Sequence, residues 1–290
     1  MVNKQNTIPL KEVRKKKISI ARILWYIVLS IAVIICAFPL YWVITSSVKP
    51  YSELFLVPST LFPQSFSLKN YFATIQYTGF VKYLGNSLLI SLSTTAITVV
   101  IGFLTAYGIT RPKLRGNGLI GKAVLIAYMF PPVILIIPLF QIISGLSLAN
   151  THIGVIITYI TFSFPFCTWM LVSYIKTIPV SLEESASIDG ALNIQVMIRI
   201  ILPLIIPAVA TTAVYTFINA WNEFLYAFVI ANSDAVRTLP AGLYAIMNSE
   251  LMEWGMLLSW TTMMLIPSVI FFASISKYII GGLTAGAVKG

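Results

Sequence analysis

The chain has 290 residues, of which 58% are hydrophobic and only 10% are charged, and its mean hydropathy is +0.90. A soluble domain carries roughly a quarter charged residues, so the composition excludes a soluble protein and indicates one integral membrane domain. The net charge of +10 does not indicate nucleic-acid binding, because the basic residues cluster in short segments beside apolar runs, as the positive-inside rule expects.

Six apolar runs are long enough to cross the membrane as helices. They cover residues 22–47, 85–110, 119–144, 153–175, 202–231 and 257–280. Because backbone polar groups in lipid must be satisfied internally, we expect an all-α, polytopic fold with six transmembrane helices. In the second run, small residues recur every three or four positions and predict a tightly packed helix face. These residues are Ser91, Thr95, Thr98, Gly102 and Ala106.

The Lys and Arg residues predict the orientation. A cytoplasmic N-terminus leaves four of the 19 basic residues outside, namely Lys49, Lys69, Lys82 and Arg237. Both termini are then cytoplasmic, and the loops at 48–84 and 231–256 are external. We therefore expect a basic cytoplasmic N-terminus over 1–21, a transmembrane domain over 22–281 and a cytoplasmic tail over 282–290. The polar loop at 179–203 lies on the cytoplasmic side.

The loop at 179–203 has the sequence of a helix–turn–helix element. Ser181 and Glu184 have the spacing of a capping box, which predicts a helix start. Asp189-Gly190 predicts a break, since Gly tolerates a positive φ, and residues 191–199 form the second helix. The element contains no lysine, so it has little reason to bind anionic lipid, and its compact shape suits a protein partner.

The same loop resembles the EAA loop of ABC import permeases, in which E-A-A, three residues, G, nine residues and I-x-L-P follow in order. Here the pattern is met by Glu184, Ser185 and Ala186, then Asp189-Gly190, Ile200, Leu202 and Pro203. Ser185 replaces alanine and is the one departure. The chain is also similar to the maltose-type (MalG-like) carbohydrate-uptake permeases at 46–50, 66–71, 106–108, 188–191, 221–224 and 281–286.

This resemblance implies a permease subunit of a binding-protein-dependent importer in the bacterial cytoplasmic membrane. The loop would be the helix that couples the permease to a cytoplasmic ATPase, with Glu184 pairing with a basic ATPase residue and Gly190 making the bend. The expected partners are a second homologous permease, two copies of the ATPase, an extracytoplasmic solute-binding protein, a sugar and membrane lipid. ATP and Mg would bind the ATPase, since this chain has no G-x-x-x-x-G-K-[ST] loop, and no cofactor is expected on the chain.

Two further features suggest a translocation pathway. Asn219, Trp221, Asn222 and Glu223 interrupt the fifth apolar run, and a charge within the membrane should face a cavity or a partner helix. Ring stacking and amide hydrogen bonds suit a sugar, whereas helix capping is an equally good explanation of these residues. Pro131-Pro132 should break the third run, either as a simple kink or as part of a pathway wall.

Other functions remain open at this point. An importer of this class could carry glycerol phosphate, a polyamine or a peptide in place of a sugar. An ion-coupled secondary transporter would usually show inverted repeats, and none is evident. A membrane-embedded enzyme would need a cluster of acidic, nucleophilic or metal-binding residues, and we expect no catalytic role for the chain itself.

Overall fold

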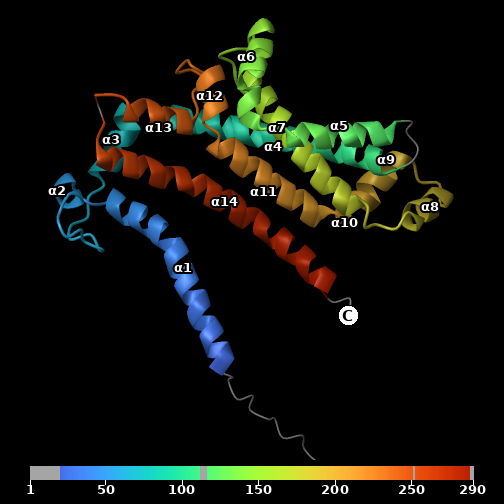
Figure 1. The fold of residues 1–290 in the computed structure, drawn as a ribbon, viewed down its shortest axis with the longest axis horizontal. Helices are drawn as coiled ribbons and strands as arrows, with labels where there is room; N and C mark the ends of the chain where they lie inside the picture. The colour runs from blue at the N-terminus through green and yellow to red at the C-terminus, as the bar shows by residue number, and fades with distance from the viewer. Residues whose placement is uncertain (1–19, 112–115, 251, 288–290) are drawn as a thin grey trace, which may run out of the picture.

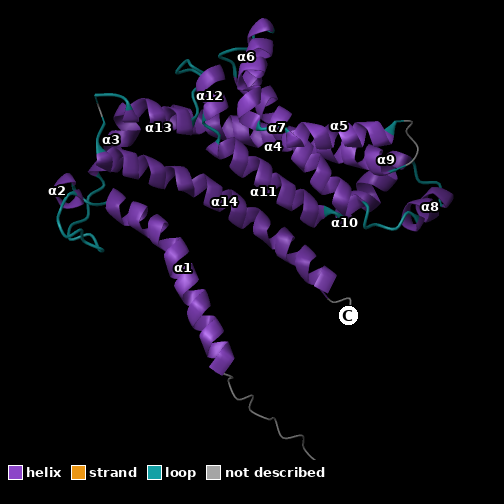
Figure 2. Ribbon diagram, in the orientation of Figure 1, coloured by secondary structure: helices purple, strands orange, loops and turns teal. Residues whose placement is uncertain are grey.

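The computed structural model describes residues 20–111, 116–250 and 252–287. Within these ranges the chain is helical and contains no strand (Figures 1 and 2). The main helices are α1 (Ile20–Ser47), α4 (Phe80–Thr110), α5 (Asn117–Met129), α6 (Ile136–Gly145), α7 (His152–Ile175), α11 (Ile206–Asn222) and α14 (Trp254–Ala287). The short ones are α2 (Tyr51–Leu54), α3 (Lys69–Tyr77), α8 (Ser181–Ile188), α9 (Asn193–Val196), α10 (Leu202–Leu204), α12 (Leu225–Ile230) and α13 (Leu239–Met247).

The described helices supply four or six membrane spans. α1, α4, α7 and α14 are each long and apolar enough to cross, and two further spans exist if each of two bent helix pairs is counted as one. The third apolar run is bent by 97° between α5 and α6, which confirms the break expected at Pro131-Pro132. The sixth run begins three residues early and extends as helix to Ala287, into the stretch expected to be a tail. The predicted basic N-terminus lies almost wholly outside the described residues.

The fifth run is not the single helix that hydropathy suggested. The helical stretch Asn193–Leu204 meets α11 at a bend of 77°, and α11 ends at Asn222 before the separate helix α12. Pro203 and Pro207 flank the bend. A proline lacks the N–H that an interior helix position needs and its ring clashes with the preceding turn, so a helix bends at such a place.

The core is the contact between α4, α7 and α11, which run side by side in Figure 1. The small residues predicted to form one packed face of α4 are all buried there. Gly102 lies close to α7: a Cβ on it would be 2.9 Å from the Sγ atom of Cys167. Small side chains let helix backbones approach in lipid, where no hydrophobic effect drives helices together.

The remaining long helices lie at the edge of this core. α14 packs along α11, and α1 contacts α14 (Figure 1). The apolar side chains of α1 stay exposed. Exposed apolar side chains on a membrane helix are solvated by lipid tails. α1 is therefore a peripheral span, and the packed body consists of the helices from α4 onward.

The expected external loop after α1 is held by two buried charges. Lys49 donates to the carbonyl of Thr60 at 2.5 Å, and its ammonium lies 4.9 Å from the centre of the Trp42 ring. Glu53 accepts from the Thr60 hydroxyl at 2.7 Å and from the backbone N–H of Gln64 at 2.8 Å. The hydrogen bond from Gln64 lowers the pKa of Glu53 below its ordinary value. Lys49 is thus a structural residue of this loop as well as a topology signal.

We predict that Gly102→Leu destabilises the core by roughly 1–3 kcal/mol, because the new side chain overpacks against the fully buried Cys167. Gly85→Leu, on the same helix, is the matched control, since a Cβ there has no neighbour within 4 Å. Thermal unfolding of the purified chain, followed by circular dichroism, measures both. Equal melting temperatures for the two variants would contradict the close α4–α7 contact.

Candidate functional site at the cytoplasmic loop

The loop predicted as a helix–turn–helix begins with α8 and turns at Gly190. Gly190 has φ +85°, and its N–H donates to the carbonyl of Ser187 at 3.1 Å. The next N–H, of Ala191, donates to the carbonyl of Ala186 at 2.9 Å. This pair of hydrogen bonds is a Schellman ending, which satisfies the last carbonyls of a helix and requires a residue that tolerates a positive φ. The predicted bend at Gly190 is therefore present.

The predicted capping box at Ser181 is absent. Val180 precedes α8 as its N-cap residue, and no side chain caps the first turn. Ser181 is already inside the helix, where its carbonyl accepts from the hydroxyl of Ser185 at 2.9 Å. The acidic residues Glu183 and Glu184 still lie in the first turn, where negative charge is favourable beside the unpaired N–H groups.

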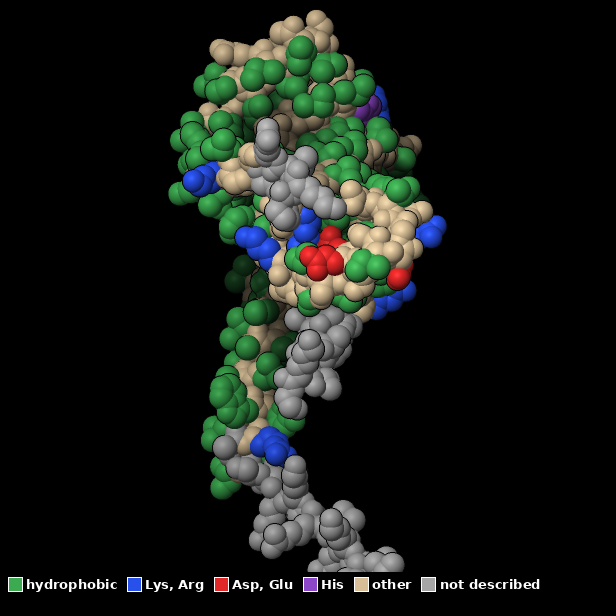
Figure 3. All heavy atoms as spheres, turned by 90° about the vertical axis from the view of Figure 1, so that its right-hand side faces the viewer, with side chains coloured by type: hydrophobic (Ala, Val, Ile, Leu, Met, Phe, Trp, Pro, Cys, Tyr) green, Lys and Arg blue, Asp and Glu red, His purple; other side chains and the backbone are tan. Residues whose placement is uncertain are grey.

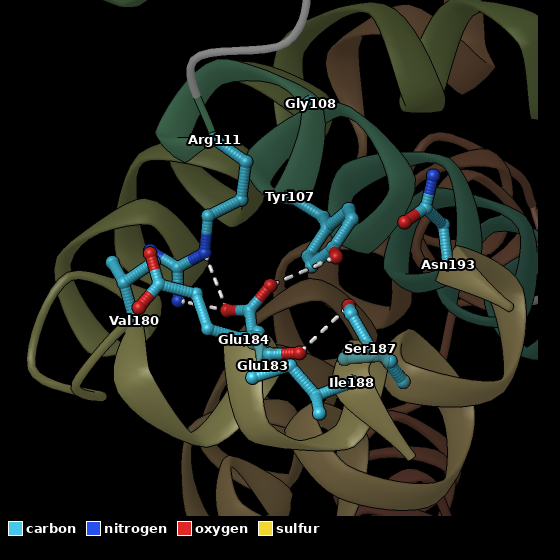
Figure 4. Close-up of a pocket in the computed structure, with 10 residues that line it drawn as sticks. Tyr107, Gly108, Arg111, Val180, Glu183, Glu184, Ser187, Ile188 and Asn193 are labelled. Carbon is cyan, nitrogen blue, oxygen red and sulfur yellow. Dashed lines mark hydrogen bonds and ion pairs between the residues drawn. The ribbon is translucent and has the colours of Figure 1, made fainter. Parts of the chain in front are cut away.

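Glu183 anchors α8 to the end of α4. Its Oε1 atom accepts a hydrogen bond from Nε of Arg111 at 2.5 Å and forms an ion pair with Nη2 at the same distance, and its Oε2 atom accepts from the Tyr107 hydroxyl at 3.0 Å (Figure 4). The side chains of Glu183 and Arg111 keep only 11% and 10% of their surface exposed. A charged pair with so little water gains from its mutual attraction and from hydrogen bonds to the remaining oxygen. The contact fixes α8 against the core.

Glu184, by contrast, is exposed. Consecutive helix residues point about 100° apart, so when Glu183 faces the core its neighbour faces outward. Of the other residues matched to the EAA pattern, Ser185, Asp189, Gly190 and Pro203 are exposed, whereas Ala186, Ile200 and Leu202 are partly buried against the core. The pattern therefore contains one set of residues that holds the loop in place and another that faces solvent.

A cavity of about 600 Å³ lies between α8, α9 and the end of α4. Glu183 and Arg111 lie in its wall together with Tyr107, and Glu184 and Ile188 also line it (Figure 4). Figure 3 shows this end of the molecule, where acidic side chains gather between basic ones. The cytoplasmic end thus presents a hollow with an exposed carboxylate beside it.

The side chains predicted to line a pathway have different surroundings. Trp221 is buried, and its ring N–H donates to the carbonyl of Met264 on α14 at 3.2 Å. Glu223 accepts from the backbone N–H groups of Tyr226 and Ala227 at 2.9 and 3.1 Å, and so caps α12.

The two asparagines of this set are both exposed, and each amide donates to the carbonyl four residues earlier on α11. Asn219 lines a cavity between α5, α7 and α11. A charged residue within an apolar run therefore marks a helix end here, while the pathway assignment of the set stays a prediction.

Sequence reasoning missed the anchor formed by Arg111, Tyr107 and Glu183. Two signals could have revealed it. Tyr107 and Arg111 are four residues apart, so they share one helix face at the end of α4. Two adjacent glutamates at the start of an amphipathic helix cannot both face the core, so one of them should be buried. Glu183 lies one position before the EAA pattern begins, so a match to that pattern does not include it.

Comparisons with known proteins agree with this geometry. Residues 98–281 match the family described as "Binding-protein-dependent transport system inner membrane component". The match covers more than half of the chain and, with relatives named as ABC transporter permeases, defines a membrane subunit of an ABC importer. The chain belongs to this family of binding-protein-dependent permeases and is a multi-pass protein of the cytoplasmic membrane.

Individual relatives extend over nearly the whole chain. The chain is 35% identical to the inner membrane ABC transporter permease protein YcjP of Escherichia coli, over 94% of this chain and 99% of that protein. It is 37% identical to the trehalose/maltose transport system permease protein MalG of Thermococcus litoralis, over 93% and 97%. Its fold is similar to that of a bacterial ABC transporter that imports the acidic polysaccharide alginate, with a TM-score of 0.78, 19% identity and coverage of 89% and 96%.

We predict that Glu183→Gln loosens α8, because the neutral amide removes the negative charge that faces the buried Arg111 guanidinium. Losing one partner of a fully buried pair costs about 3–5 kcal/mol, and the slight exposure of this pair reduces the cost. Hydrogen exchange of the α8 amides in nanodiscs should accelerate by at least about tenfold. Glu184→Gln is the matched control and should leave α8 exchange unchanged. Equal exchange in both variants would show that Glu183 does not anchor the helix.

Proposed function

We propose that this permease imports a sugar or oligosaccharide by alternating access, driven by ATP hydrolysis in a separate ATPase that docks on the exposed side of α8. The assembly would contain a second homologous permease, two ATPase copies and an extracytoplasmic solute-binding protein. ATP and Mg would bind the ATPase. The observation that carries the proposal is the different position of two adjacent glutamates. Glu183 is buried against the core, and Glu184 is exposed.

The surface around α8 supports a protein partner. Ile188 and Leu192 are 86% and 64% exposed, although they lie in a polar loop beyond the membrane spans. Clustered exposed apolar residues with a polar rim mark interaction sites. Glu184 supplies an exposed carboxylate for a basic residue of the partner, and the cavity beside it offers room for a partner side chain.

The anchor explains how a force on α8 would reach the membrane. Arg111 and Tyr107 join α8 to α4, while the stretch 193–204 leads through a bend into α11. α4 and α11 are both core helices. Movement of the docked loop would therefore be transmitted to two packed helices at once, and the bends at 205 and 130–135 would allow the rest of the bundle to respond.

The relatives support a sugar as the cargo. The trehalose/maltose permease of Thermococcus litoralis aligns over 93% of this chain at 37% identity. The alginate importer shares the fold, and its cargo is an acidic polysaccharide, whereas trehalose and maltose are uncharged. A carbohydrate is the cargo class that these two have in common. The pathway residues Asn219 and Asn222 offer amide groups of the kind that bind sugar hydroxyls.

We predict that Glu184→Ala and Gly190→Pro each abolish most binding-protein-stimulated ATP hydrolysis and sugar uptake by the reconstituted complex. Glu184→Ala removes the docking carboxylate. Gly190→Pro imposes φ near −65° where the loop needs +85°, and removes an N–H that is hydrogen-bonded. Ser173→Ala, on the exposed face of α7, is the control and should transport normally.

Membrane insertion and copurification of the second permease distinguish a coupling defect from misfolding. If both variants insert, assemble and pump at the wild-type rate, the loop is a simple connection and the docking proposal is wrong. If the wild-type complex hydrolyses ATP without any response to its binding protein, the importer mechanism itself is wrong.

A further inference from the structure

A third cavity is a small groove between α5 and α7, at the cytoplasmic end of the membrane spans. Its volume is about 280 Å³, and Ile109 of α4 also lines it. α5 lies alongside α4 and α7 in Figure 1 and contacts both. The groove shares no lining residue with the cavity that Asn219 lines. We call it the α5–α7 groove.

Each of the two helices places its groove residues on one face. On α5, Gly121 and Lys122 follow Gly118 at three and four positions, and on α7, Lys176 follows Trp169 at seven. Residues three, four or seven positions apart lie on the same side of a helix. Lys176 is the C-cap residue of α7, so the groove reaches the end of that span. It is therefore formed by two regular helix surfaces that face each other.

The walls of the groove are apolar and leave room. A Cβ on Gly118 would have no neighbour within 4 Å, and one on Gly121 would lie 3.4 Å from the Cγ2 atom of Ile109. On the α7 side, Val172 is buried and the Trp169 ring is part of the exposed surface. Lipid tails are as apolar as leucine side chains, so an acyl chain can pack against such walls.

Two cations lie at this groove without an acidic partner. Lys122 and Lys176 both line it and are exposed, and neither forms an ion pair within the described parts of the chain. No Asp or Glu lines the groove, and the sequences of α4, α5 and α7 contain none. Basic pockets between helices on the cytoplasmic side of a membrane bind the headgroups of anionic lipids. The charge of the groove is complementary to such a headgroup.

The order of these groups along α7 matches the order of groups in a phospholipid. Trp169 lies about 10 Å from Lys176 along the helix axis, on the side of the membrane interior. Lysine side chains extend toward the interface, and tryptophan is enriched at the headgroup level. A phosphate beside the two ammonium groups therefore places the upper part of an acyl chain beside the Trp169 ring. A soluble anion would leave the apolar walls without a partner.

Membrane topology alone does not explain this arrangement. The positive-inside rule accounts for lysines at the cytoplasmic end of a span. Arg22 on α1 and Lys277 on α14 satisfy the same rule, are equally exposed in class and do not line the groove. The rule gives no reason for two lysines from different helices to share one apolar groove with a tryptophan.

We infer that the α5–α7 groove binds one anionic phospholipid of the cytoplasmic leaflet. The ammonium groups of Lys122 and Lys176 pair with its phosphate, and one acyl chain lies along Trp169 and the glycine face of α5. A zwitterionic lipid binds less well, because its headgroup carries a positive group that the lysines repel. The bound lipid joins α5 to the end of α7, from which the chain continues into the loop that holds α8.

Quenching of Trp169 measures occupancy of the groove. The assembled importer is placed in phosphatidylcholine vesicles that contain phosphatidylglycerol as about one lipid in five. In paired samples either one lipid or the other carries bromine on its acyl chains, and bromine quenches a neighbouring indole. Subtracting the emission of Trp169→Phe isolates this residue from the other tryptophans of the chain. Its relative affinity for phosphatidylglycerol over phosphatidylcholine should be about tenfold or more.

Charge variants distinguish the groove from a generally basic surface. Lys122→Gln combined with Lys176→Gln should lower the relative affinity to about one, and each single variant should lower it about threefold to fivefold. Arg22→Gln combined with Lys277→Gln removes the same charge from the same side of the membrane and should leave the relative affinity unchanged. Copurification with the second permease shows that each variant is folded and assembled.

A shape variant tests the groove without changing any charge. Gly118→Leu keeps both lysines and places a side chain in the open space of the α5 wall, so it should lower the relative affinity about fivefold or more. Gly85→Leu is the matched control, since a Cβ there also has no neighbour within 4 Å and Gly85 does not line the groove. It should bind the anionic lipid as the wild type does.

Four results would overturn the lipid site. The first is equal affinity of the wild type for the two lipids, and the second is an equal loss in the Arg22 and Lys277 control, which would show diffuse attraction. The third is a preference that the isolated full-length chain has and the assembled importer lacks, which would show that the second permease covers the groove. The fourth is displacement of the brominated lipid by millimolar glycerol phosphate, which would assign the groove to a soluble phosphate. The assay involves no transport, so its result is separate from that of the proposed function.

Discussion

The ion pair between Arg111 and Glu183 is the interaction on which the cytoplasmic architecture depends. It joins the short surface helix α8 to the end of the core helix α4. The pair is nearly buried from water, and the Tyr107 hydroxyl donates to the second carboxylate oxygen of Glu183. Without it, α8 would be attached to the bundle by loops and by the apolar contacts of Ala186. With it, α8 is fixed directly to the end of α4.

A second constraint comes from the helix breaks. Two pairs of prolines, Pro131 with Pro132 and Pro203 with Pro207, interrupt runs that are otherwise apolar enough to cross the membrane. One break forms part of the wall of a cavity, and the other joins the loop at 179–203 to the core helix α11. Non-helical backbone within the bilayer is tolerated where it lines a cavity, and Phe130 and Pro132 line one at the first break. The bends adjoin a closely packed core, in which small residues of α4 pack on α7.

Much of this could be predicted from the sequence, because lipid imposes strong rules. The six apolar runs, the small-residue face of α4, the break at Pro131-Pro132 and the turn at Gly190 follow from hydropathy, spacing and backbone chemistry. The division of the fifth run could not be predicted, since hydropathy averages across a bend. Nor could the choice between Glu183 and Glu184 as the buried acid, which depends on where Arg111 lies in space. The contact of Trp221 with α14 and the capping of α12 by Glu223 depend on tertiary structure, and the pathway assignment of these residues stays a prediction.

Site-specific photo-cross-linking at Ile188 tests the central claim most directly, because this residue is 86% exposed on the outer side of α8. A photoreactive amino acid placed there in the assembled importer should cross-link to the ATPase chain, and one at Trp25, which is 75% exposed on α1, should not. Cross-linking of position 188 to lipid, or to no protein, in an assembly that still pumps would contradict the account.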